Sequence, residues 1–148
     1  MKACTLIMLA LIIGLVGATA LAGDRGTPDE AKAMAIKAAK YLKDVGPDKA
    51  FAAFDVKDNE WHDRDLYVYV LAPDATVLAH GGIAGYIGKS IASLKDVDGN
   101  SIAGLINAIP DQGWAEYKWQ NPVTKAIELK TSYAVKVGDD HVVVGAYK

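Results

Sequence analysis

The chain has 148 residues, of which 51% are apolar, and its formal net charge is −2. These values fit one globular domain. The small net charge, with no Lys/Arg-rich stretch among aromatic residues, argues against nucleic acid as a partner. The sequence has no internal repeat or low-complexity tract, which argues against a solenoid or a long linker.

The N-terminal segment is typical of a secretory signal peptide. Lys2 is the only charged residue before an apolar run over residues 6–16. Ala20-Leu21-Ala22 then places small residues at the two positions that a signal peptidase reads.

We therefore predict a signal peptide over residues 1–22, a mature domain over residues 23–148, and a periplasmic or secreted location. The alternative is an uncleaved anchor, because residues 3–22 come close to the ~20 residues that span a bilayer. Cys4 is the only cysteine and would leave with the signal peptide. The mature domain would then have no disulfide and no thiol chemistry.

Two helices are predicted at the start of the mature domain. Thr27 can cap a helix and Glu30 can complete a capping box with it. The first helix should cover residues 28–45 and end at Gly46-Pro47, and a second, short helix should cover residues 48–54.

A hairpin at the centre of the chain follows a polar loop, in which Trp61 is expected to pack as a lid. Residues 66–71 are an unbroken apolar and aromatic run, which predicts a strand buried on both faces. Residues 72–75 predict a turn, and residues 76–80 the returning strand. Simple alternation places Thr76, Leu78 and His80 on one face of that strand.

The second half of the chain predicts a loop, a short helix and three more strands. The order of elements favours an α+β fold, with one antiparallel sheet of five strands, a long helix on one face and a pocket under the central insertion. The segments are a glycine-rich loop (81–88), a turn (96–100), a short helix (101–109) and strands (114–120, 127–137, 141–147).

Metal and catalytic motifs are weak. Residues 96–100 are similar to the start of a calcium loop, but the glycine comes too early and Asn107 stands where the glutamate belongs, so we predict a plain turn. The three histidines lack the spacing of zinc ligands. No serine lies in a nucleophile elbow. We expect no enzymatic activity, metal or cofactor.

The last strands carry aromatic and basic residues. Tyr117 and Trp119 should share one face of their strand. Lys130 and Tyr133 are three residues apart, so a bulge or a strand edge must intervene if both reach one site. The alternative is that the tyrosines are core residues and Lys130 is an exposed charge.

Taken together, several short segments resemble the type-2 single Cache domains, which are PAS-like extracytoplasmic sensor modules of bacteria. The resemblance covers residues 30–147. It rests on Asp65-Leu-Tyr-Val-Tyr-Val70, Thr76-Val-Leu-Ala-His80, Gly88-Lys89, Leu94-Lys-Asp-Val-Asp-Gly99, Gly113-Trp-Ala-Glu-Tyr-Lys-Trp119, Asn121-Pro122, Lys130-Thr-Ser-Tyr133 and Val144-Gly-Ala-Tyr147.

The resemblance implies a five-stranded antiparallel sheet backed by a long N-terminal helix, and a site for small molecules such as short carboxylates. Family members usually have a proline directly after the histidine, where this chain has Gly81-Gly82. The chain ends at Lys148, just after the last strand, so it resembles a free-standing periplasmic version that would signal through a membrane receptor or kinase partner.

We therefore expect a periplasmic module that binds a small organic anion, most simply a monocarboxylate, between the sheet and residues 81–100. The alternative is an interaction or accessory protein that keeps the fold without a ligand. Lys130 would supply the charge, and strand parity is not expected to place all the aromatic candidates in one cavity. The candidate ligand-binding residues are Tyr67, Tyr69, His80, Gly81, Gly82, Tyr117, Trp119, Lys130 and Tyr133.

Overall fold

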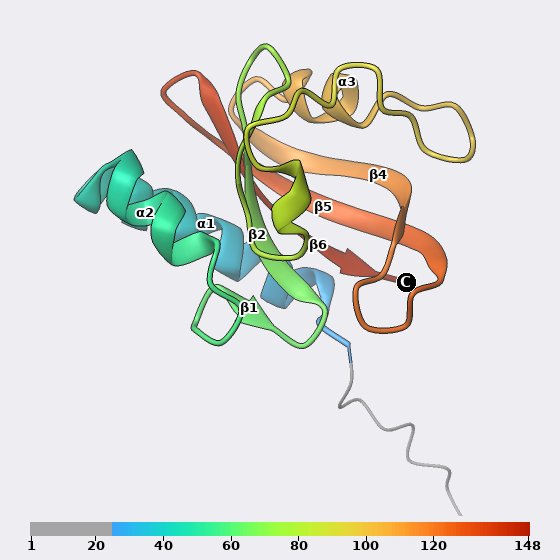
Figure 1. Ribbon diagram of the computed structural model, residues 1–148, viewed down its shortest axis with the longest axis horizontal. Coiled ribbons are helices and arrows are strands. Elements are labelled where there is room, and N and C mark those ends of the chain that lie inside the picture. Colours follow the sequence, from blue (N-terminus) through green and yellow to red (C-terminus); the bar gives the residue numbers. More distant parts are fainter. Residues whose placement is uncertain (1–24) are drawn as a thin grey trace, which may run out of the picture.

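The computed structural model describes residues 25–148 (Figure 1), so the expected signal peptide lies outside the described residues. No helix in the described part of the chain is long and apolar enough to cross a membrane. The elements are α1 (Pro28–Val45), α2 (Pro47–Phe54), β1 (His62–Asp63), β2 (Leu66–Leu71), β3 (Val77–His80), the 3-10 helix η1 (Ala84–Tyr86), α3 (Ile102–Asn107), β4 (Gln112–Gln120), β5 (Ile127–Val137) and β6 (Asp140–Tyr147).

Helix α1 begins with the predicted capping box. The Glu30 amide donates to Thr27 Oγ1 at 3.2 Å, and the Thr27 amide donates to Glu30 Oε2 at 2.8 Å. Four alanines form most of the buried face of the helix, and their small side chains let its backbone lie close to the sheet. They are Ala31, Ala35, Ala38 and Ala39.

The sheet is antiparallel, with the strand order β1-β2-β6-β5-β4 and with β3 also paired to β2. The two-residue strand β1 was not predicted, and it brings the sheet to six strands. All six residues of β2 are buried, as the apolar run predicts. The α+β fold with a long N-terminal helix and an antiparallel sheet is confirmed.

Two apolar clusters cover the two faces of the sheet. Figure 1 shows α1 behind the sheet, and the 81–100 segment with α3 in front of it. Alternate residues of β2 divide between them, so that Val68 packs in the α1 cluster and Tyr67 in the front cluster. Trp61 is not a lid over the front face. It packs against Tyr41 and Phe54 in the α1 cluster.

A β-bulge changes the facing of β3. Val70 pairs with Ala79 but Leu71 pairs with Val77, so Leu78 is the extra residue. Val77 therefore joins the front cluster, while Leu78 packs against the α1 cluster. The predicted sharing of one face by Leu78 and His80 is wrong, because alternation fails at the bulge.

Candidate functional site

A small cavity lies between the front face of the sheet and the 81–100 segment. Its volume is about 30 Å³, room for little more than a water molecule or two. The lining residues are Tyr67, Tyr69, Val77, His80, Tyr86, Ile91, Leu94, Ile102, Tyr117 and Trp119.

All four aromatic candidates from β2 and β4 line this cavity, contrary to the expectation from strand parity. The register explains why. Tyr117 pairs with Lys130, which pairs with Tyr147, so the three side chains share a face. Val143 lies on the same face of β6 and pairs with Tyr69 on β2, so Tyr69 shares this face as well.

Lys130 is not itself a lining residue, but it is buried against Tyr67, which is, and 1% of its surface is exposed. Its Nζ donates to the Tyr67 hydroxyl at 2.8 Å, and lies 4.0 Å from the centre of the Tyr67 ring and 4.9 Å from that of Tyr147. Among the described residues, no carboxylate lies within ion-pair distance of it. Burial lowers the pKa of Lys130 to about 7, a shift that the carboxylate of Asp65 opposes. The alternative of an exposed lysine is therefore wrong.

Gly145 makes this placement of Lys130 possible. A β-carbon on Gly145 would lie 2.3 Å from Lys130 Cε and 2.3 Å from Ser132 Oγ. The lysine side chain therefore crosses β6 over the glycine to reach Tyr67 on β2. Sequence reasoning missed Gly145, although a glycine inside a buried strand often marks such a close approach.

Hydroxyl groups form two chains around the lysine. Tyr69 Oη lies 3.0 Å from Tyr117 Oη, which lies 2.9 Å from Ser132 Oγ. Tyr67 Oη lies 3.4 Å from Tyr147 Oη, which donates to the Gln120 carbonyl at 3.0 Å. Burial raises the pKa of all four tyrosines, so they stay neutral donors and acceptors.

His80 is a neutral group in the wall of the cavity. Its Nδ1 accepts hydrogen bonds from the amides of Gly82 at 3.2 Å and Ile83 at 2.8 Å. Burial, and then the charge of Lys130, lower the pKa of His80 to about 3. With Nδ1 accepting, the proton of the neutral ring is on Nε2, which makes His80 a donor through that atom.

The glycine amides do not serve as free donors. Gly81 donates to the Val68 carbonyl at 2.9 Å, and Gly82 donates to His80. The two glycines instead allow close packing. A β-carbon on Gly82 would lie 2.9 Å from the Tyr67 ring, and one on Gly81 would lie 2.8 Å from the Phe54 carbonyl oxygen.

Tyr133 does not belong to the site. Strand β5 pairs with β6 without interruption from Lys130 to Val137, so no bulge intervenes and Tyr133 faces away from Lys130. Its ring packs edge-on against Trp114, and Lys32 Nζ lies 5.2 Å from its centre. The structure therefore does not bring Tyr133 to the cavity with the other candidates.

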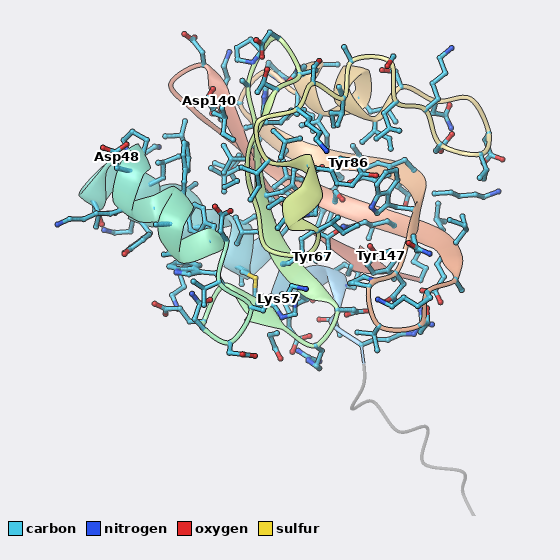
Figure 2. The ribbon with its side chains drawn as sticks, in the orientation of Figure 1. Asp48, Lys57, Tyr67, Tyr86, Asp140 and Tyr147 are labelled. Carbon is cyan, nitrogen blue, oxygen red and sulfur yellow. The ribbon has the colours of Figure 1, made fainter. Side chains whose placement is uncertain are left out.

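Tyr86 also lines the cavity, and sequence reasoning missed it as well. It lies on η1, with ring centres 5.7 Å from His80 and 5.9 Å from Trp119. Figure 2 labels Tyr86 and Tyr67 in the region between η1 and the sheet. Gly85 and Gly88 flank Tyr86 with open space around them. These glycines are compatible with movement of the segment.

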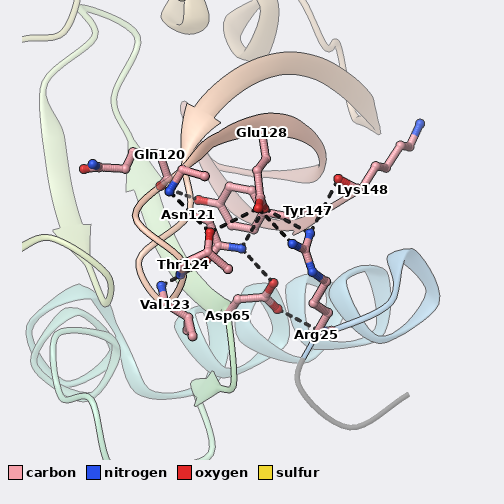
Figure 3. A network of polar contacts seen from close by, with 11 residues as sticks. Arg25, Asp65, Gln120, Asn121, Val123, Thr124, Glu128, Tyr147 and Lys148 are labelled. Atoms are coloured by element: carbon pink, nitrogen blue, oxygen red, sulfur yellow. Dashed lines mark hydrogen bonds and ion pairs between the residues drawn. The ribbon is translucent and has the colours of Figure 1, made fainter. Parts of the chain in front are cut away.

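A polar network fixes the end of the sheet beside Lys130 (Figure 3). Asp65 is fully buried and accepts from the Gly26 amide at 2.7 Å and from Asn121 Nδ2 at 3.2 Å. Asn121 Nδ2 also donates to Glu128, which forms an ion pair with Arg25 at 2.8 Å. The network ties the start of α1 to the β4–β5 turn and holds the side chain of Asp65 in place.

The comparisons with known proteins agree with this architecture. The family model described as Single Cache domain 2 matches residues 25–147. The chain belongs to this family. A comparison with curated proteins gives no match.

Solved structures of chemotaxis sensors resemble this Cache domain. A methyl-accepting chemotaxis protein from Vibrio parahaemolyticus is 25% identical with a TM-score of 0.67, over 80% of this chain and 86% of that one. A structure titled as the basis for carboxylic acid recognition by a Cache chemosensory domain is 17% identical with a TM-score of 0.59, over 80% and 86% of the two chains. A periplasmic sensor domain of a chemotaxis protein is 15% identical with a TM-score of 0.58, over 80% and 88%.

The chain is thus a Cache sensor domain that resembles domains of chemotaxis receptors. The family agrees with the resemblance seen in the sequence.

Proposed function

We propose that this Cache domain senses a small organic anion, of the monocarboxylate class, that binds in the Tyr67 cavity and changes the position of the 81–100 segment. The observation that carries the proposal is Lys130, a fully buried lysine with no carboxylate partner in the described chain. A buried ammonium is stabilised when an anion compensates its charge.

The surroundings of Lys130 favour a carboxylate with a short apolar tail. Tyr67 Oη and His80 Nε2 are available as neutral donors, and Trp119, Ile91 and other apolar side chains line the rest of the cavity. One compensating cation favours a monoanion over a dianion. A ligand of four non-hydrogen atoms has a ceiling of about 6 kcal/mol, which corresponds to a Kd no tighter than tens of micromolar.

Tyr86 would move when the ligand enters. The cavity of about 30 Å³ is too small for acetate, so entry requires η1 to shift away from Trp119. A shift of this segment would be the signal that a membrane receptor or kinase partner reads. Export of residues 23–148 after removal of the signal peptide is part of this proposal.

A thermal-shift screen tests the proposal against formate, acetate, propionate, pyruvate, lactate and amino acids. Ligand at ~100 times its Kd adds about 2.7 kcal/mol to the free energy of unfolding, which raises Tm by several degrees. At tens of micromolar affinity, this requires millimolar ligand at constant ionic strength. A rise with one or more monocarboxylates, absent in Lys130→Met, supports the proposal.

The second candidate is an interaction protein that keeps the Cache fold without a ligand. The observation that favours it is the small volume of the cavity, about 30 Å³, together with the amides of Gly81 and Gly82 bonded inside the protein. No change in Tm with any compound of the screen favours this candidate.

A further inference from the structure

Lys130 is surrounded by side chains that carry no negative charge. The elements packed around the lysine contribute Tyr67 and Tyr69 from β2, His80 from β3, Tyr117 from β4 and Tyr147 from β6. In the part of the chain that the structure describes, the one acid whose field reaches it is Asp65, which is bonded to Gly26 and Asn121 instead.

The protonated lysine is therefore poorly compensated in the empty protein. Its one hydrogen-bonding partner within residues 25–148 is a neutral hydroxyl, and a neutral amine makes the same bond as donor. Burial lowers the pKa of Lys130 to about 7, so both forms are populated near neutral pH.

We propose that a carboxylate enters the Tyr67 cavity together with one proton from solvent, which Lys130 accepts. The inference rests on the proposed function of the same cavity. The bound state is an ammonium–carboxylate pair, whereas the empty state at alkaline pH holds a neutral amine and no anion. In net terms the cavity then takes up the neutral weak acid. Ligand binding therefore depends on pH as well as on ligand concentration.

The other titratable groups around Lys130 do not account for this proton uptake. Burial keeps the tyrosines neutral throughout the range from pH 6 to 9, and His80 has a pKa of about 3. Short monocarboxylates are already ionised above pH 6. Proton uptake between pH 6 and 9 is therefore specific to Lys130 among the titratable groups packed around it.

Calorimetric titration with the monocarboxylate that gives the largest thermal shift tests the inference. At each pH, two buffers of different ionisation enthalpy and without carboxylate groups report the number of protons taken up. With a pKa near 7, uptake should be about 0.9 proton per ligand at pH 8 and about 0.1 at pH 6. Affinity should be level below pH 6 and fall about tenfold from pH 8 to pH 9.

An NMR titration supplies a second readout. The ¹³Cε resonance of Lys130, assigned by its absence in Lys130→Met, should titrate near pH 7 in the empty protein and stay in the charged form up to pH 9 with saturating ligand. Ligand binding without buffer-dependent heat, with constant affinity from pH 6 to 9, would overturn the inference and leave the proposed function standing. Absence of binding at every pH would overturn both.

Discussion

Replacing Lys130 with methionine should make the unliganded domain more stable while removing its ligand response. Methionine keeps an unbranched chain that fits over Gly145 and removes the buried ammonium. The side chain is 1% exposed, so its charge has little contact with solvent. This trade-off is expected where a charged group is kept for binding rather than for stability.

The magnitude follows from the pKa of Lys130. Folding lowers it from 10.5 to about 7, and each pKa unit corresponds to about 1.4 kcal/mol. At pH 6 the charged form thus lowers the free energy of unfolding by up to about 5 kcal/mol relative to a neutral side chain. Loss of the hydrogen bond to Tyr67 returns about 1 kcal/mol, and loss of the ring contacts about 1–2 kcal/mol. The expected net gain is about 2–3 kcal/mol.

The sign of the pH dependence is fixed by the direction of the shift. Folding lowers the pKa of Lys130. The folded protein therefore has its full stability above the unfolded pKa of 10.5, and this stability is lost as the pH falls through about 7. The wild-type protein should therefore lose stability relative to Lys130→Met from pH 9.5 down to pH 6. Titrating groups that the two proteins share cancel in this difference.

Urea denaturation of both proteins at pH 6, 8 and 9.5 measures the effect. The matched control is Lys136→Met, on the same strand but only partly buried, and it should change stability by less than about 0.5 kcal/mol. If Lys130→Met were less stable than wild type at pH 6, Lys130 would not be an uncompensated buried charge and the reasoning would be wrong.

Three further predictions concern packing, ionisation and export. Gly145→Ala should cost about 1–3 kcal/mol in stability and weaken ligand binding, because its β-carbon would lie 2.3 Å from Lys130 Cε. The control is Gly113→Ala, whose β-carbon would make an ordinary contact at 3.6 Å. Equal effects of the two changes in denaturation and calorimetry would count against this role of Gly145. In ¹⁵N NMR the His80 ring should show no titration from pH 5 to 8 and an unprotonated Nδ1, since its pKa of about 3 lies far below that window. Its contribution to stability should decline as the pH falls from 6.5 toward 3. A titration midpoint near 6.5 would contradict the buried, neutral ring. The intact mass of natively exported protein should correspond to a chain that starts at Gly23, and a species that keeps Met1 in the membrane fraction would favour an anchor.

The sequence was sufficient for most of the fold because local signals agree there. The capping box at Thr27 and the apolar run of β2 act within a few residues, and neither depends on the distant chain. The positions of the five predicted strands along the chain follow from local patterns of the same kind. Strand β1 was missed, since two residues, one partly buried and one exposed, carry no periodicity.

The site was only partly predictable because it depends on register between distant strands. Lys130, Tyr117 and Tyr147 share a face through pairing that no local pattern determines. Tyr133 was misplaced because an uninterrupted strand alternates strictly, and Leu78 because a bulge breaks alternation. Gly145 carried a readable signal, a glycine within a buried strand, but its partner could not be named without the fold.

A crystal structure of the domain with the strongest monocarboxylate ligand tests the central claim most directly. We expect the carboxylate about 2.7–2.9 Å from Lys130 Nζ. Its tail should lie between Tyr69 and Trp119, with Tyr86 moved away from Trp119. A ligand bound elsewhere, for example in the groove between α1 and β4 beside Ile36 and Lys136, with the 2.8 Å bond from Lys130 to Tyr67 unchanged, would contradict the account.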